Sequence, residues 1–206
     1  MENIYLSTQT SLTTIITVGI FFIGLGYLNS KKIPNNKSYI VGDRKEDVFS
    51  LTTSLTASAL GAWVLFGPAS AATWGGIGAV IGYALGTAAP MLFLYNFGPK
   101  IRTEFPNGLT LTEFIKKRFG LSILKISLFL IFFYMTIFLV AEVTAIAFLL
   151  NYISQIPLWL TSAITLIICL AYILRGGFKL SILTDKYQFI FIVIMILISV
   201  FLILGN

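Results

Sequence analysis

The chain has 206 residues, of which 57% are hydrophobic and only 11% charged, with a mean hydropathy of +0.93. Soluble domains carry about 25% charged residues, so this composition excludes a soluble protein and indicates an integral membrane protein. The net charge of +6 is explained by membrane topology and anionic lipid headgroups, and we expect no nucleic-acid partner.

Six apolar segments are each close to the roughly 20 residues that a helix needs to cross a bilayer. The first has no positive charge before it and no small-residue cleavage pattern after it, so we expect a retained helix rather than a signal peptide. The expected membrane spans are residues 11–28, 51–74, 76–97, 126–150, 158–174 and 187–204.

All 14 Lys and Arg residues fall in three connections, within residues 31–45, 100–125 and 175–186. Basic side chains in short loops resist translocation, so we expect these loops on the cytoplasmic side of a plasma or inner membrane and both termini outside. The one regular element expected in them is an amphipathic helix, because Thr110 and Glu113 have the spacing of a capping box.

The second span has an interrupted pattern, since Gly61, Gly67 and Pro68 fall within it among several Ser and Thr residues. Glycine and proline weaken a helix, and a freed carbonyl in hydrocarbon is tolerated only where it is buried or lines a polar cavity. Transporters use such carbonyls to hold Na⁺. A simple proline kink packed against neighbouring helices is the alternative.

The third span carries Gly78, Gly82 and Gly86 at four-residue spacing, a smooth stripe that favours close helix packing.

Two acidic residues stand out among the spans. Glu142 lies deep in the fourth span, where carboxylates usually face the bundle interior and serve ions or protons. It could equally join helices through a hydrogen bond. Asp185 precedes the last span between Lys179 and Lys186, and it is either a helix N-cap or an anionic station on an ion exit path.

Four stretches together resemble the amino-terminal part of the sodium/solute symporter family, which includes sodium-coupled proline, sugar, pantothenate and urea carriers. They are the Ala57-Ser58 pair with Trp63 and Gly67, the run LTLTEFIKKRFG, the run AEVTAIA around Glu142, and RGGFKLSILTDKYQ. The resemblance implies an all-α integral membrane protein with a leading helix and a five-plus-five helix, LeuT-like inverted-repeat fold. Residues 1–50 would be the leading helix with its cytoplasmic loop, and residues 51–206 the first repeat, with the second repeat missing.

The resemblance also implies roles for individual residues. The backbone carbonyls of Ala57 and Leu60 would supply part of a sodium site, and Asp185 matches an acidic residue associated with sodium passage. Ala59 departs from family members that have a polar side chain there. On this hypothesis the substrate cavity is lined by Ser58, Gly61, Trp63 and Gly67, and Glu142 is a further ion-pathway residue.

We therefore expect the amino-terminal part of a sodium-coupled transporter that imports a small organic solute, with Na⁺ as the coupling ion and the second half lost, separately encoded or omitted from this chain. The alternative is a non-transporting membrane subunit or truncated remnant that packs against another polypeptide. An enzyme is not expected, because the sequence has no His, one Cys and no pair of intramembrane acids.

Overall fold

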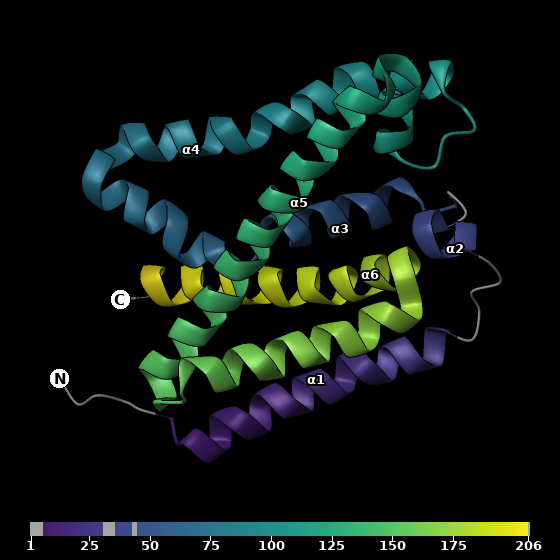
Figure 1. Ribbon diagram of the computed structural model, residues 1–206. Helices are drawn as coiled ribbons and strands as arrows, with labels where there is room; N and C mark the ends of the chain where they lie inside the picture. The colour runs from purple at the N-terminus through teal and green to yellow at the C-terminus, as the bar shows by residue number, and fades with distance from the viewer. Residues whose placement is uncertain (1–5, 31–35, 43–44, 206) are drawn as a thin grey trace. The chain divides into compact units, whose positions relative to one another are not determined.

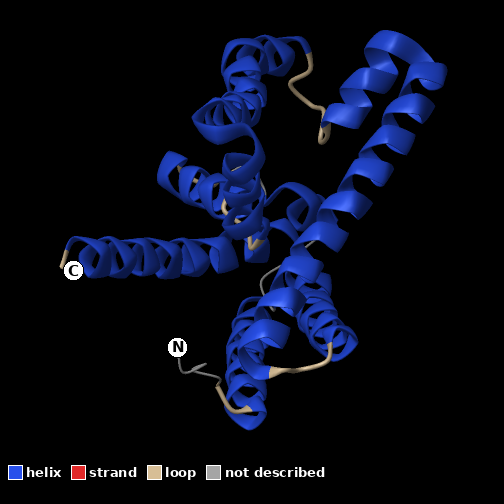
Figure 2. Cartoon of the chain, turned by 90° about the vertical axis from the view of Figure 1, so that its left-hand side faces the viewer, coloured by secondary structure: helices blue, strands red, loops and turns tan. Residues whose placement is uncertain are grey.

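The computed structural model describes residues 6–30, 36–42 and 45–205, which form helices joined by short connections and contain no strand (Figures 1 and 2). Lys31, Lys32 and Arg44 of the first basic loop lie outside the described residues. The helices are α1 (Thr8–Ser30), α2 (Asn36–Val41), α3 (Val48–Ala59), α4 (Trp63–Glu104), α5 (Leu111–Ser154) and α6 (Leu158–Leu204).

Each of the three long helices is divided by one glycine with a positive φ angle. Gly76 in α4, Gly120 in α5 and Gly177 in α6 have φ values of 57°, 82° and 54°. Residues with a Cβ atom rarely adopt such positive φ values. Gly76 lies at the expected connection between the second and third spans. Each long helix thus consists of two helical segments that meet at a glycine.

The amphipathic helix expected after Leu109 is confirmed as the first part of α5. The Glu113 N–H donates to Thr110 Oγ1 over 3.3 Å, and the Glu113 carboxylate accepts from the Leu109 N–H at 2.8 Å. The carboxylate thus reaches one residue further back than in a standard capping box.

The expectation that this is the one regular element of the basic connections is wrong. The short helix α2 lies in the first connection, residues 98–104 extend α4, and residues 178–186 belong to α6. The basic residues in these stretches did not prevent helix formation because Lys and Arg have high helix propensity.

Among the residues that the structure describes, four helical segments are long and apolar enough to cross a membrane: Thr8–Asn29, Phe66–Glu104, Leu111–Ser154 and Gly176–Leu202. Leu158–Leu174 is a shorter apolar helix. The 12 residues of α3 extend only about 18 Å, less than the roughly 30 Å of a hydrocarbon core. The six-span count and the sidedness of the termini stay predictions.

The chain divides into two compact units, one formed by Met1–Ala62 with Glu142–Asn206 and the other by Trp63–Ala141. In the first unit, α1 lies alongside the first part of α6, and α2 and α3 also contact α6 (Figure 1). Aromatic pairs join the elements: Phe22 lies 6.0 Å from Tyr172, and Phe21 lies 5.7 Å from Tyr187, between ring centres. This unit contains the break after α3, Glu142 and Asp185.

Candidate functional site

The second expected span is interrupted after α3, where Leu60, Gly61 and Ala62 are not helical. The Leu60 N–H donates to the carbonyl oxygens of Thr56 at 3.0 Å and Ala57 at 3.2 Å. Leu60 is the C-cap residue of α3, and its φ of −100° and ψ of 48° take its backbone out of the helical conformation. The carboxyl end of a helix carries partial negative charge, so peptide oxygens at this end of α3 favour a cation.

The interruption occurs at Gly61 and not at the proline. Pro68 lies inside the helical residues of α4, six residues after Ala62. At the sixth residue of that helix, its missing N–H removes the hydrogen bond to the Val64 carbonyl, yet the helical residues continue through this position. The expected break in this segment is therefore confirmed, whereas the proline-kink alternative does not describe it.

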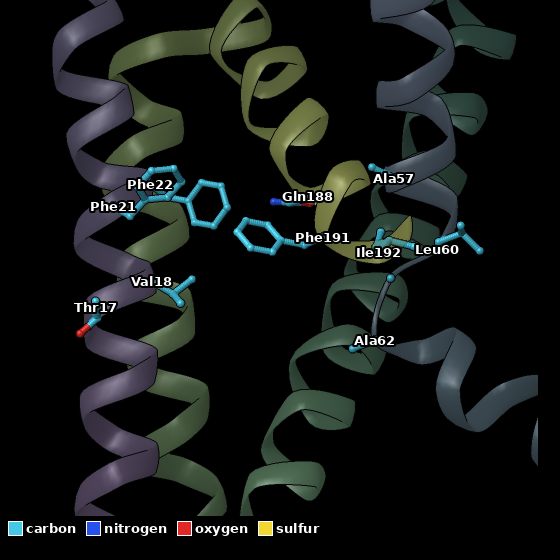
Figure 3. A pocket seen from close by; sticks show the side chains of 11 residues that line it. Thr17, Val18, Phe21, Phe22, Ala57, Leu60, Ala62, Gln188, Phe191 and Ile192 are labelled. Carbon is cyan, nitrogen blue, oxygen red and sulfur yellow. The ribbon is translucent and has the colours of Figure 1, made fainter. Parts of the chain in front are cut away.

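A cavity of about 620 Å³ lies beside this break (Figure 3). One wall comes from the end of α3 and the break, a second from α1, and a third from the last part of α6. Most of the lining is apolar, and the Gln188 amide and the Thr17 hydroxyl are its polar side-chain groups. The lining residues are Thr17, Val18, Phe21, Phe22, Ala57, Leu60, Gly61, Ala62, Gln188, Phe191 and Ile192.

The carboxylate of Glu142 lies directly against Gly61. A Cβ atom built at Gly61 would lie 2.6 Å from Glu142 Oε2 and 2.5 Å from its Cδ atom. Both distances are far below van der Waals contact, so only glycine leaves room for the carboxylate in this position. The structure thus brings the deeply placed acid of α5 to the break that follows α3.

The second acidic residue, Asp185, contacts α3 one helical turn before Ala57. The Ser54 hydroxyl donates to Asp185 Oδ2. Ser54 and Asp185 are both half-buried, and their contact joins α3 to α6. The interpretation of Asp185 as a helix N-cap is wrong, because Asp185 lies within the helical residues of α6.

Asp47 fixes the start of α3, a role that the sequence did not single out. It is the N-cap residue, and it accepts hydrogen bonds from the Ser50 N–H at 3.3 Å and from the Ser50 hydroxyl. The Ser50 hydroxyl lowers the pKa of the Asp47 carboxyl below its usual range, and the positive charge of Lys186 acts in the same direction. The carboxylate therefore stays ionised at neutral pH.

The residues proposed for the substrate cavity are not all brought together. Gly61 lines the cavity, whereas Ser58 is exposed on α3 and is not among its lining residues. Trp63 and Gly67 belong to the second compact unit, where a Cβ atom at Gly67 would lie 2.8 Å from Nε1 of the Trp63 indole. Their part in a substrate cavity stays a prediction.

Several lining residues were not predicted, above all Phe21 and Phe22 of α1 and Phe191 of α6. Apolar side chains in an apolar helix give no signal of which face meets a cavity. Gln188 did offer a signal, because an amide within a membrane segment needs a partner. No group of three or more His, Cys, Asp or Glu residues that could hold a metal ion occurs in the described part of the chain.

The sequence is similar to those of curated transporters. The chain is 26% identical over 194 residues to the spermidine transporter DUR31 of Candida albicans, covering 94% of this chain and 37% of that protein. It is 28% identical over 180 residues to the sodium-coupled monocarboxylate transporter 2 of Danio rerio, covering 86% of this chain and 27% of that protein. No solved structure gives a significant match.

The chain thus spans roughly a third of the length of these curated relatives. A family model matches residues 39–205, which include the break after α3, Glu142 and Asp185 and leave out α1. The protein belongs to the sodium:solute symporter family.

Proposed function

We propose that the protein acts in sodium-coupled import of a small organic solute, with Na⁺ bound at the break after α3. The observation that carries this proposal is the end of α3 at Ala59, which leaves Leu60 and Gly61 outside helical structure and in the lining of a cavity. Discontinuous helices in secondary transporters coordinate Na⁺ through carbonyls of this kind. The Ala57 carbonyl accepts one hydrogen bond and has a second lone pair for an ion.

The carbonyls of Ala57 and Leu60 are too few to replace the hydration shell of a cation. Because the chain spans about a third of its curated relatives, we propose that helices beyond those of this chain supply the remaining oxygen ligands. The inverted repeat of the family would place those helices around the same midplane site.

Two acidic residues would act on the ion at different points of its path. Glu142 lies against Gly61, so its negative charge stabilises a cation, or a cationic group of the solute, at the break. Asp185 contacts Ser54, which precedes Ala57 in α3, and Asp185 would receive the ion on its way to the cytoplasm. This direction assumes that the three basic connections are cytoplasmic.

The solute is proposed only as a class. One relative is named as a spermidine transporter and another as a monocarboxylate transporter, so members of this family differ in the charge of what they carry. We propose a small organic solute whose apolar part would occupy the cavity beside the break, because most of the lining is apolar.

The test is uptake of radiolabelled spermidine and propionate by cells that make the complete protein, in sodium medium and in choline medium of equal osmolarity. We expect accumulation of at least one probe in sodium medium and its loss in choline medium. Cells without the protein give the background. Equal uptake in both media would overturn sodium coupling.

A further inference from the structure

Ser54 and Asp185 form a polar contact in a tightly packed part of the first unit. The Ser54 hydroxyl donates to Asp185 Oδ2 across 131 residues of sequence. The residues next to them, Thr53 on α3 and Thr184 on α6, are 3% and 1% exposed. A carboxylate beside such a packed interface has few ways to turn, so the Ser54 hydroxyl sets which oxygen it presents.

The contact lies close to the proposed sodium ligands. Ser54 precedes Ala57 by three residues, which is about 4.5 Å along a helix axis. The lining of a smaller cavity of about 200 Å³ includes Lys186, the residue after Asp185, together with Lys179 and Glu46. On the proposed exit path, an ion that leaves the Ala57 carbonyl toward the start of α3 passes the Asp185 carboxylate.

Na⁺ bound to a carboxylate neutralises part of its negative charge. The hydrogen bond that the Ser54 hydroxyl donates to Asp185 then loses part of its charge assistance, and the polar contact between α3 and α6 becomes weaker. When the ion departs, the hydrogen bond strengthens again. The contact is therefore strongest when Asp185 carries no ion.

We propose that Ser54 is a positioning residue that orients Asp185 and holds α3 against α6 until Na⁺ reaches the carboxylate. This inference rests on the proposed function, because it assumes that Na⁺ moves from the break toward Asp185. Without the Ser54 hydroxyl, α3 is less firmly held to α6, and Na⁺ dissociates toward the cytoplasmic side more quickly.

The test measures dissociation of ²²Na⁺ alone from the complete protein, as its gene encodes it, in phospholipid vesicles. We expect Ser54→Ala to accelerate dissociation about tenfold, the size expected for a hydrogen bond to a charged acceptor. Ser54→Thr keeps the hydroxyl and should stay within threefold of the unsubstituted protein. Thr52→Ala removes a hydroxyl from an exposed position on the same helix and serves as the matched control.

A double-variant cycle separates positioning from a general structural effect. If Ser54 acts through Asp185, adding Ser54→Ala to Asp185→Ala changes the dissociation rate by less than twofold. A tenfold effect that persists in the Asp185→Ala background would overturn the inference, as would equal rates for Ser54→Ala and the unsubstituted protein. Should Ser54→Ala fail to insert, rapid dissociation from Ser54→Thr would also overturn it.

Absence of any ²²Na⁺ binding by the unsubstituted protein is a distinct result. It would overturn the proposed function and this inference together, whereas the outcomes above leave sodium coupling intact.

Discussion

The contact between Gly61 and the Glu142 carboxylate allows a quantitative test of the site. In Gly61→Ala, the new Cβ atom would lie 2.5 Å from Glu142 Cδ and 2.6 Å from Oε2, so the carboxylate must move away from the break. The overlapping atoms are the far end of a flexible side chain, so their displacement costs about 1 kcal/mol, the lower end of the range for overpacking. If that cost falls on the ion-bound state, the Na⁺ concentration for half-maximal binding rises about fivefold.

The assay is equilibrium binding of ²²Na⁺ to the complete protein, with thermal stability in detergent measured in parallel. Glu142→Asp shortens the side chain by one methylene group and relieves the overlap, so the double variant Gly61→Ala/Glu142→Asp should recover part of the affinity lost in Gly61→Ala. Gly24→Ala is the matched control, because a Cβ atom at Gly24 in α1 meets nothing within 4 Å.

Two results would refute this reasoning. One is a Gly61→Ala variant whose Na⁺ affinity and thermal stability both equal those of the unsubstituted protein. The other is a loss of affinity that the added Glu142→Asp substitution does not reduce, since the overlap would then not be its cause.

Three further predictions concern helix ends and the glycine in α6. Because the pKa of Asp47 is lowered in the folded protein, its ionised carboxylate stabilises α3 above the unfolded-state pKa of about 3.9, and this stabilisation is lost as the pH falls through the pKa of the folded state. The melting temperatures of Asp47→Asn and the unsubstituted protein should therefore differ at pH 7 and become more similar as the pH is lowered to 3. Gly177→Ala should lower the free energy of unfolding by about 1–3 kcal/mol, because φ at Gly177 is 54° and the new Cβ atom would lie 2.5 Å from the Tyr39 carbonyl oxygen. An unchanged melting temperature would contradict this prediction. Thr110→Ala removes the hydrogen bond from the Glu113 N–H to the Thr110 hydroxyl, so the first turn of α5 should lose about 1 kcal/mol of local stability and exchange its amide hydrogens faster. Equal exchange rates in the two proteins would show that this cap does not stabilise the helix.

Local patterns predicted the helices and some of their ends. The six apolar segments all lie within helical residues apart from the break at 60–62 and Gly76, and the Thr110 to Glu113 spacing marked the start of α5. These features depend on residues within one or two turns of each other, or on the cost of exposing polar groups to lipid. The same reasoning predicted the break in the second span, and the family resemblance pointed to Ala57 and Leu60 beside it.

Tertiary structure decided which residues the break meets. The sequence marked Glu142 and Asp185 as unusual acids, but it could not pair Glu142 with Gly61 or Asp185 with Ser54, which is 131 residues away. It also gave no sign that aromatic residues of α1 line the cavity. Composition and periodicity reveal that a segment is helical and apolar, whereas the face that each helix turns to its neighbours depends on how distant segments pack.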